Sequence, residues 1–275
     1  MIRHLCTVGT VVSIVCSSPY ARAAEVPTKF TPFSATYGIY WLGLPVYSGS
    51  IRVKSVAGSY DIAVNNSSRG LMNLIRRSKH DIVASGRING ALRSNQHYRL
   101  LSRLSGKRIQ VEIERDNAGK VQVRRQVRPA KKIKKKRPPV SQARMKEAFD
   151  PASGFLLGVM RPLDGRPCAR SIPFFDGIRR FNIAFSGTSE IPKTIRQPGL
   201  QGTRAVRCRI HVRRIAGFTQ TEARDTDRAV KRKATVLFVW APQYGLWVPL
   251  RIKYDSKWGP VSIEILRIRL DNKLK

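Results

Sequence analysis

Apolar and polar residues alternate along much of the chain with a period of two. Around Ile109, Val111 and Ile113, the apolar residues are separated by Arg, Gln and Glu, and residues 206–212 and 261–265 repeat this pattern. Successive side chains of a β-strand point to opposite faces of the sheet. Each stretch therefore predicts an antiparallel strand with one buried and one solvated face.

The alternation shifts phase after Ile265, where Leu266, Ile268 and Leu270 become the apolar set. One extra residue in the strand produces such a shift, so we expect a β-bulge there. Further extended segments are predicted between turn-forming residues. They are Phe33–Trp41, Tyr47–Val56, Tyr60–Ser67, Asp81–Arg87, Leu92–Ser102, Val121–Val127, Arg179–Ser186, Ala234–Trp240 and Trp247–Tyr254.

Two segments have helical rather than alternating spacing. Residues 69–77 form a short one. The second is better marked, because Asp150 has the chemistry of an N-cap, Pro151 suits the first helical position, and apolar residues follow as far as Met160. Many short strands with one or two helices predict a mainly β fold. We expect an antiparallel curved sheet, a half-barrel or roll, with the helices covering its open side.

The N-terminus predicts export from a bacterial cytoplasm. A short basic start precedes a mostly apolar run up to Cys16, and Ala21 and Ala23 place small residues where signal peptidase cleaves. The run is shorter than the ~20 residues of a membrane-spanning helix; a permanent N-terminal anchor is the alternative. We therefore expect a signal peptide at residues 1–23, a single β-rich domain at residues 24–275 and a periplasmic location.

Cys168 and Cys208 are the cysteines that remain after removal of residues 1–23. Two cysteines in an oxidising compartment predict one disulfide, with Cα atoms ~4.4–6.8 Å apart. A pair of buried free thiols is the alternative.

The chain is strongly basic, with 52 Lys and Arg against 17 Asp and Glu and a formal net charge of +35. Such a surface attracts polyanions. For an exported protein these are anionic lipid, lipopolysaccharide and wall polymers, and nucleic acid is not an expected partner. A basic surface without a specific partner is the alternative, because the arginines are spread over many predicted strands.

Basic residues are densest within residues 124–139, which we expect to interrupt the domain as an exposed loop. So charged a run repels itself and cannot bury a core. Peripheral contact with an anionic membrane is one role for it. The candidate anion-binding residues are Lys131, Lys132, Lys134, Lys135, Lys136 and Arg137.

Residues that carry enzyme chemistry are sparse. His80, His97 and His211 are isolated in the sequence, so no metal-ligand spacing exists and neither a metal nor a cofactor is expected. Asp176 precedes Gly177 between two extended segments, which predicts a hairpin turn; contact with a ligand is the alternative role for Asp176. A lone carboxylate lacks the partner that glycoside hydrolysis needs, so we expect no enzyme.

Aromatic residues gather near the C-terminus. Such residues pack in a core or along sheet edges more often than they line a cavity, and both roles remain open. They are Trp240, Tyr244, Trp247, Tyr254 and Trp258.

Several motifs are spread over most of the chain. They are the stretch Trp41–Gly49, the helix starting at Asp150-Pro151, Arg166-Pro167-Cys168, the element Phe175–Phe181, Cys208, and Trp247-Val248-Pro249. Together they resemble an uncharacterised exported family, domain of unknown function 3108 (DUF3108), over about Phe33 to Leu270. The resemblance implies a periplasmic β-rich protein, similar to the half-barrel of outer-membrane lipoprotein carriers, with no established catalytic residues.

The leading hypothesis is a non-catalytic envelope protein that binds an amphiphile, such as lipid, lipopolysaccharide or a lipid-modified protein, in the concavity of the sheet. The alternative is a structural or interaction protein whose basic surface contacts anionic envelope polymers. A large apolar cavity favours the first hypothesis, and a filled core with clustered surface arginines favours the second. A cleft holding two carboxylates favours an enzyme acting on glycans.

Overall fold

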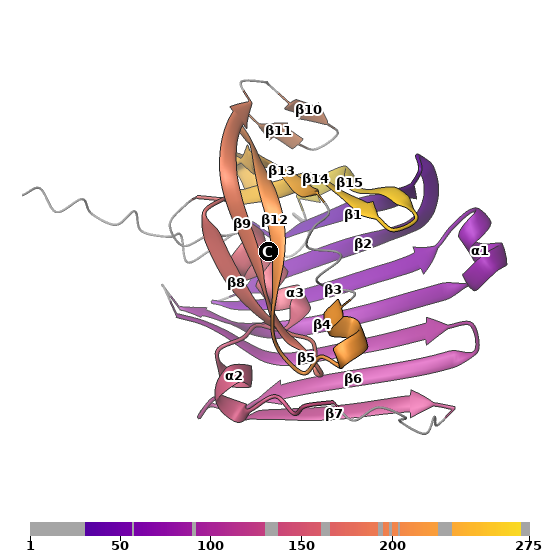
Figure 1. The fold of residues 1–275 in the computed structure, drawn as a ribbon. Helices are drawn as coiled ribbons and strands as arrows, with labels where there is room; N and C mark the ends of the chain where they lie inside the picture. The colour runs from indigo at the N-terminus through magenta and orange to yellow at the C-terminus, as the bar shows by residue number, and fades with distance from the viewer. Residues whose placement is uncertain are drawn as a thin grey trace, which may run out of the picture.

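The computed structural model describes residues 31–56, 58–89, 92–129, 137–160, 166–191, 195–197, 200–202, 204–224 and 233–270. One antiparallel sheet dominates this part of the chain (Figure 1). It contains 13 strands in the order β7-β6-β5-β4-β3-β2-β1-β15-β14-β13-β12-β9-β8, and β10 and β11 form a separate small hairpin. The mainly β fold predicted from the sequence is therefore confirmed.

The elements follow the predicted segments closely. The strands are β1 (Phe33–Trp41), β2 (Leu44–Val56), β3 (Ser59–Ser68), β4 (Ser78–Asn89), β5 (Leu92–Leu104), β6 (Lys107–Arg115), β7 (Val121–Arg128), β8 (Arg170–Phe175), β9 (Arg180–Ile191), β10 (Ile195–Gln197), β11 (Leu200–Gly202), β12 (Ala205–Ala216), β13 (Ala234–Ala241), β14 (Leu246–Ser256) and β15 (Gly259–Leu270). The helical segments are α1 (Leu71–Arg76), α2 (Gln142–Lys146), α3 (Pro151–Ser153), η1 (Gly154–Met160) and η2 (Pro242–Tyr244). Within the described residues, no helix has the length and hydropathy needed to cross a membrane.

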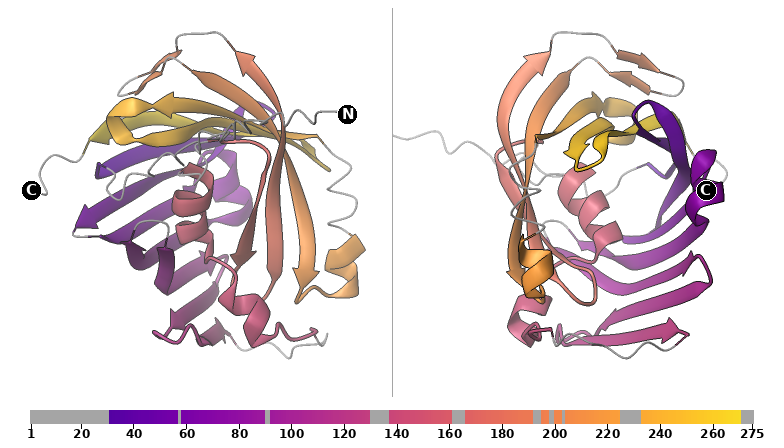
Figure 2. Two further views of the ribbon diagram at one scale, coloured as in Figure 1. Left: turned by 90° about the vertical axis from the view of Figure 1, so that its left-hand side faces the viewer. Right: turned by 45° about the vertical axis from the view of Figure 1, so that its right-hand side comes forward.

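Apolar side chains form rows across the concave face of the sheet. Phe33 pairs with Val53, Val53 with Ile62, Ile62 with Ala84, and Ala84 with Tyr98. Each of these five residues is at most 3% exposed. The sheet curves around this buried face (Figure 2), as expected when one face of every strand is apolar and the other is polar.

The first and last described strands, β1 and β15, lie side by side in the sheet. Between Thr36 and Tyr37 their register shifts from Arg267 to Ile265, so Leu266 is the extra residue of a bulge. The bulge expected from the phase shift of the sequence is therefore confirmed.

The predicted helix after Asp150 lies inside the curve of the sheet (Figure 2). Its first turn, α3, continues directly as the π-helical segment η1, whose Leu156 and Leu157 are fully buried. Gly158 allows this segment to approach β8 closely, because a Cβ atom at position 158 would lie 2.6 Å from Ile172 Cγ2.

The chain between β7 and β8 joins the two edges of the sheet. On one side, Phe149 donates its N–H to Pro173 O (3.0 Å) and accepts from Phe175 N (2.8 Å), next to β8. On the other side, the Gln142 side chain accepts from Val121 N (3.1 Å) and donates to Val121 O (2.9 Å), at the start of β7. The gap between the edge strands is thus bridged by α2 and the residues around it.

Part of the segment expected to form a basic loop, residues 124–139, is a strand. Residues up to Arg128 belong to β7, which pairs with β6 from Val121 to Arg128. Arg124 and Arg128 occupy the polar positions that alternate with Val121 and Val123, whereas Arg125 shares the face of the valines, and all three arginines are exposed on this edge strand. Residues 130–136, and with them the five candidate lysines, lie outside the described residues, as does the expected signal peptide.

Candidate functional site

An apolar cavity of about 280 Å³ lies between the concave face of the sheet and the start of the interior helix. Helical residues Pro151, Ala152 and Phe155 form one wall. The other walls come from six strands, β1 to β4, β14 and β15. Their lining residues are Ala35, Tyr37, Ile51, Val64, Ile82, Pro249, Ile252, Ile263 and Ile265.

The alternation of the strands creates this lining. Ala35 pairs with Ile51, Ile51 with Val64, and Val64 with Ile82, so four neighbouring strands each supply one inward-facing apolar side chain. Three of these four residues are only partly buried, unlike the adjacent row that begins at Phe33. The helix therefore covers one row completely and leaves the next row lining open space.

Tyr37 marks the boundary of the cavity. Its ring lies against the backbone of Gly49 on the neighbouring strand, since a Cβ atom at position 49 would be 2.5 Å from Tyr37 Oη. Burial raises the pKa of Tyr37 to about 12, so the phenol is neutral at physiological pH. A glycine at position 49 is thus what allows an aromatic residue to close this side of the cavity.

A polar row follows the apolar lining towards one end of the sheet. Asn66 lies two residues beyond Val64, and its cross-strand partner His80 lies two residues before Ile82, so both share the inward face. The Oδ1 atom of Asn66 is buried and makes no hydrogen bond within the part of the chain that the structure describes. Burial lowers the pKa of His80, and the charge of Asp81 opposes this shift. The concave face therefore passes from an apolar cavity to uncharged polar groups.

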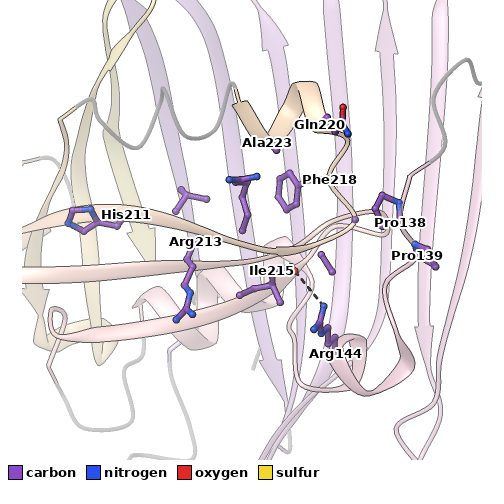
Figure 3. Close-up of a pocket in the computed structure, with 13 residues that line it drawn as sticks. Pro138, Pro139, Arg144, His211, Arg213, Ile215, Phe218, Gln220 and Ala223 are labelled. Carbon is purple, nitrogen blue, oxygen red and sulfur yellow. Dashed lines mark hydrogen bonds between the residues drawn. The ribbon is translucent and has the colours of Figure 1, made fainter.

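A larger, open groove of about 770 Å³ lies between the second half of β12, Pro138–Pro139 and a helical turn at residues 220–224 (Figure 3). Arg144 and Arg213 line it, and Arg144 donates to Ile215 O at 3.5 Å. Among the described residues, its lining is cationic and includes no carboxylate. This groove has the charge that an anionic partner requires.

Of the predicted anion-binding residues, Arg137 is the one that the structure describes. Its guanidinium donates two hydrogen bonds of 2.6 Å to the Glu222 carboxylate and a third to Gly217 O (3.1 Å). Arg137 therefore fixes the helical turn of residues 220–224 to the segment that precedes α2. The anion-binding role of Arg137 and of the five lysines stays a prediction.

Asp176 stabilises the hairpin between β8 and β9. Its Oδ1 atom accepts from the backbone N–H groups of Ile178 (3.0 Å) and Arg179 (2.6 Å), and Oδ2 accepts from Arg179 Nε (2.9 Å). The hairpin turn predicted at Asp176-Gly177 is confirmed. Both carboxylate oxygens are occupied by this turn, and a ligand contact for Asp176 stays a prediction.

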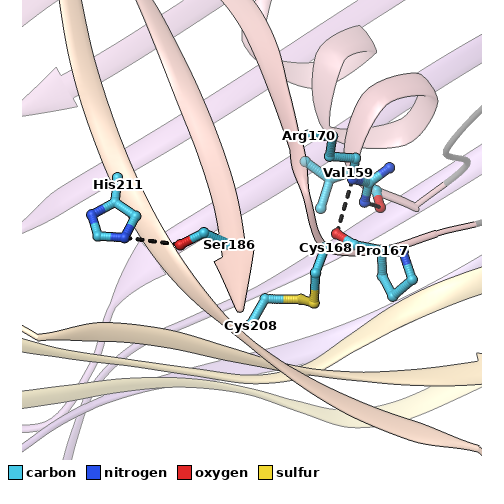
Figure 4. The surroundings of a disulfide bond; sticks show 7 residues. All are labelled: Val159, Pro167, Cys168, Arg170, Ser186, Cys208 and His211. Atoms are coloured by element: carbon cyan, nitrogen blue, oxygen red, sulfur yellow. Dashed lines mark hydrogen bonds between the residues drawn. A yellow bond between two sulfur atoms is a disulfide. The ribbon is translucent and has the colours of Figure 1, made fainter. Parts of the chain in front are cut away.

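Cys168 and Cys208 form the predicted disulfide, with Cα atoms 5.7 Å apart (Figure 4). Both residues are at most 1% exposed. Next to the bond, the Arg170 side chain donates to Gly158 O (2.6 Å) and Val159 O (2.7 Å), which satisfies carbonyl groups near the end of η1. The disulfide thus lies where the interior helix returns to the sheet.

Groups with enzyme-like chemistry are scattered over the described residues. No group of three or more His, Cys, Asp or Glu residues there is arranged to hold a metal ion. His211 Nε2 lies 3.1 Å from Ser186 Oγ on adjacent strands, at an exposed position (Figure 4). Among the described residues no carboxylate joins this pair to complete the arrangement of a hydrolase.

The C-terminal aromatic residues do not line the cavity. Tyr244 and Trp247 are buried in the core, and Trp247 packs against Trp240 with ring centroids 5.6 Å apart. Trp258 is 69% exposed in the turn between β14 and β15. The sequence predicted that Ile263 and Ile265 face inward and that the other lining strands are extended, but the convergence of these residues on Pro151, Ala152 and Phe155 depends on where the helix lies.

Comparisons with known proteins match the chain to one family and relate its fold to a solved structure. A family model described as "Protein of unknown function (DUF3108)" matches residues 36–266. The crystal structure of a β-barrel-like protein of domain of unknown function DUF1849 from Brucella abortus is similar, with a TM-score of 0.50 and 10% identity, over 89% of this chain and 99% of that chain. A protein from Parabacteroides distasonis, whose structure is described as that of a putative lipoprotein, matches with a TM-score of 0.34 and 11% identity, over 88% of this chain and 97% of that chain. Among curated proteins, none matches the chain in sequence.

Proposed function

The chain belongs to the DUF3108 family of proteins of unknown function, and we propose that it binds an amphiphile. The apolar part of this ligand lies in the cavity beneath the interior helix, and its polar part lies at the Asn66–His80 row. The cavity is the observation that carries this proposal. Apart from Tyr37, its lining residues are aliphatic, proline or phenylalanine. Its volume of about 280 Å³ lies near the lower end of known ligand sites, roughly 300–1,000 Å³.

The partial burial of the lining favours a ligand that enters from the open face. Apolar side chains left beside a cavity forgo both hydrophobic burial and dispersion contacts. An acyl chain of a lipid or of a lipid-modified protein restores these contacts without requiring a charged partner. The buried Oδ1 atom of Asn66 accepts a hydrogen bond from a hydroxyl or amide at the head of such a ligand.

We propose that the protein acts in the periplasm after removal of a signal peptide. The Cys168–Cys208 disulfide is consistent with export, because disulfides persist in oxidising compartments. The predicted signal peptide at residues 1–23 supplies the route. We further propose that binding involves no catalytic step, since the cavity lining supplies shape and apolar surface rather than a paired acid and base.

Replacement of Ala152 by Phe tests this function, because the larger side chain occupies the space next to Phe155. We expect the variant to bind cis-parinaric acid, a fluorescent fatty acid, about tenfold more weakly or worse than the wild type. Val64→Thr is a second variant with nearly unchanged volume that places a hydroxyl group in the lining. It should also weaken binding while the protein remains folded.

Ala63→Phe is the matched control. Ala63 lies on β3 next to Val64 but faces away from the cavity, so this variant should bind the probe like the wild type. Thermal melting of each variant establishes that it is folded. Unchanged probe binding by both folded cavity variants would contradict the proposed function.

A further inference from the structure

Three connections of the sheet meet at one end of the molecule and expose apolar side chains there. They are the β1–β2 turn, α1 between β3 and β4, and the β14–β15 turn, which lie together on the right-hand side of Figure 1. We call this end the rim. Its exposed apolar residues are Leu42, Leu44, Leu71, Leu74, Ile75 and Trp258, which are between 53% and 85% exposed.

The rim is a continuous structure rather than three separate loops. Trp41 Nε1 donates to Trp258 O at 2.7 Å, which joins the β1–β2 turn to the β14–β15 turn. Arg69 N donates to Val46 O at 2.8 Å, which joins the entry of α1 to β2. Hydrogen bonds thus hold the three apolar tips next to one another.

Helix α1 has an unusual composition for an exposed helix. Its sequence is Leu-Met-Asn-Leu-Ile-Arg, yet none of its residues is buried. Asn73 accepts a hydrogen bond from Ser68 Oγ (2.6 Å), and this contact fixes the helix to the end of β3. Leu74 and Ile75, 85% and 66% exposed, therefore project into solvent from an anchored helix. Large exposed apolar patches mark interaction surfaces.

The positive charge of the rim indicates which kind of partner it binds. Four exposed cations, Arg69, Arg76, Arg77 and Lys257, lie among the apolar residues of the rim. Residues 41–46, 69–77 and 256–259 contain no carboxylate. The Lys257 ammonium lies 4.7 Å from the centre of the Trp258 ring. Apolar and aromatic side chains surrounded by Lys and Arg are typical of protein surfaces that insert into the headgroup region of anionic membranes.

The rim also lies at the end of the sheet to which the cavity extends. Ile263 pairs with Ile39 and with Ile252, and both Ile263 and Ile252 line the cavity. Val261 lies two residues closer than Ile263 to the β14–β15 turn, and it pairs with Trp41 and with Tyr254. Short stretches of β14 and β15 therefore separate the apolar cavity from the rim.

We propose that the rim is a docking surface for an anionic lipid bilayer. The apolar tips of the three connections enter the interface, and the four cations contact lipid headgroups. The inference rests on the proposed function, because it names the surface from which the cavity takes its amphiphile.

The triple variant Leu74→Ser, Ile75→Ser and Trp258→Ser tests the docking surface. It is compared with the wild type by cosedimentation with vesicles of phosphatidylglycerol and phosphatidylcholine, using protein expressed with its native N-terminus and purified in the processed form. We expect the triple variant to bind about tenfold more weakly or worse, because large apolar side chains leave the interface. All three side chains are exposed, so the variant should remain folded.

Two control variants separate the rim from the general charge of the protein. Val56→Ser with Leu270→Ser removes exposed apolar residues at the opposite end and should leave vesicle binding unchanged. Replacement of Arg69, Arg76, Arg77 and Lys257 by Gln should weaken binding by about fivefold per cation. The same replacement of Lys54, Arg87, Arg124 and Arg125 should have a much smaller effect. Equal effects of the two fourfold replacements, or equally tight binding to vesicles of phosphatidylcholine alone, would overturn the proposal.

Binding of cis-parinaric acid in solution distinguishes the rim from the cavity. Rim variants should retain it, because none of the substituted residues lines the cavity. A rim triple variant that loses vesicle binding but keeps the probe supports the docking surface. Unchanged vesicle binding with a cavity that still binds the probe would overturn the docking surface alone.

Discussion

Asp150 caps the interior helix, as the sequence predicts, and is itself buried beneath the sheet's concave face. Its Oδ1 atom accepts from the N–H groups of Ala152 and Ser153, both at 2.9 Å, and the residue is 1% exposed. Tyr60 donates to Ser153 Oγ at 2.9 Å, so the capped turn is also joined to β3. Burial and the nearby charge of Asp150 raise the pKa of Tyr60. The cap thus positions the helix turn that forms one wall of the cavity.

Asp150→Ala should lower the free energy of unfolding by about 1–2 kcal/mol, the usual effect of losing an N-cap. Asp150→Asn should cost less, because the amide oxygen still accepts from the two N–H groups. Urea denaturation measures both changes. Asp61→Ala, at an exposed position of β3, is the control and should change stability by less than about 0.5 kcal/mol. Equal losses for Ala and Asn would show that the charge of Asp150, and not its cap, matters.

The Arg137–Glu222 pair makes stability depend on pH. The hydrogen bond from Arg137, with help from Thr219, lowers the pKa of Glu222 to about 2, whereas an unfolded Glu titrates near about 4.3. A carboxyl group with a lower pKa in the folded state stabilises the fold above the unfolded pKa. This contribution is lost as pH falls towards the folded pKa. About a third of each side chain is exposed, so the contribution is modest.

We therefore expect the difference in unfolding free energy between the wild type and Glu222→Gln to be constant above about pH 5 and to shrink between about pH 5 and pH 2. Urea denaturation at a series of pH values measures this difference. The comparison cancels the titration of other carboxylates that are the same in both proteins. In an Arg137→Gln background, the same comparison should show almost no pH dependence. A difference that persists at pH 2 would contradict the assignment.

At the scale of elements, the disulfide joins the segment that leads into β8 to strand β12, and β9 pairs with both strands. These three strands form the end of the sheet that the interior helix meets through Gly158 and Arg170. Neither cysteine lines the cavity. The bond therefore supports this end of the sheet without taking part in the proposed binding.

The double variant Cys168→Ala and Cys208→Ala should lose about 3–4 kcal/mol of stability, the chain-entropy estimate for a closed loop of 40 residues. Reduction of the wild type should produce a similar loss, whereas the double variant should be insensitive to reductant. Urea denaturation with and without dithiothreitol measures both effects. At temperatures where the double variant is folded, it should bind cis-parinaric acid like the wild type. A reductant-sensitive double variant would exclude the disulfide as the source of the effect.

For the whole molecule, local pattern predicted the elements better than their arrangement. The bounds of β1 agree with the predicted segment, and Leu266 is the bulge that the phase shift indicated. The pairing of Phe33 with Leu270 lies beyond local pattern, because it brings together residues from opposite ends of the described chain. The cavity depends on this same long-range pairing, since β1, β14 and β15 all line it.

The high positive charge of residues 124–128 led to a wrong prediction of where β7 ends, and the reason is physical. Arg124 and Arg125 belong to a run that looked too basic for a strand, yet both lie in β7. A strand at the edge of a sheet tolerates such residues, because both Arg124 on the outer face and Arg125 on the face of the valines remain exposed to water. The expected limits of the loop were therefore drawn from its basic composition. The extent of the strand instead agrees with the spacing of Val121, Val123 and Val127.

The bridge between β7 and β8 has a consequence for self-association. Strand edges with free N–H and C=O groups are templates on which another chain can add a strand and begin to aggregate. Here backbone contacts from Phe149 cover part of the β8 edge, and the amide of Gln142 occupies both backbone groups of Val121 in β7. The remaining length of β7 carries Arg124, Arg125 and Arg128, whose like charges repel the β7 edge of a second copy. In this incompletely closed sheet, the covered part of the β8 edge and the positive charge of the β7 edge both oppose the addition of a strand from a second copy.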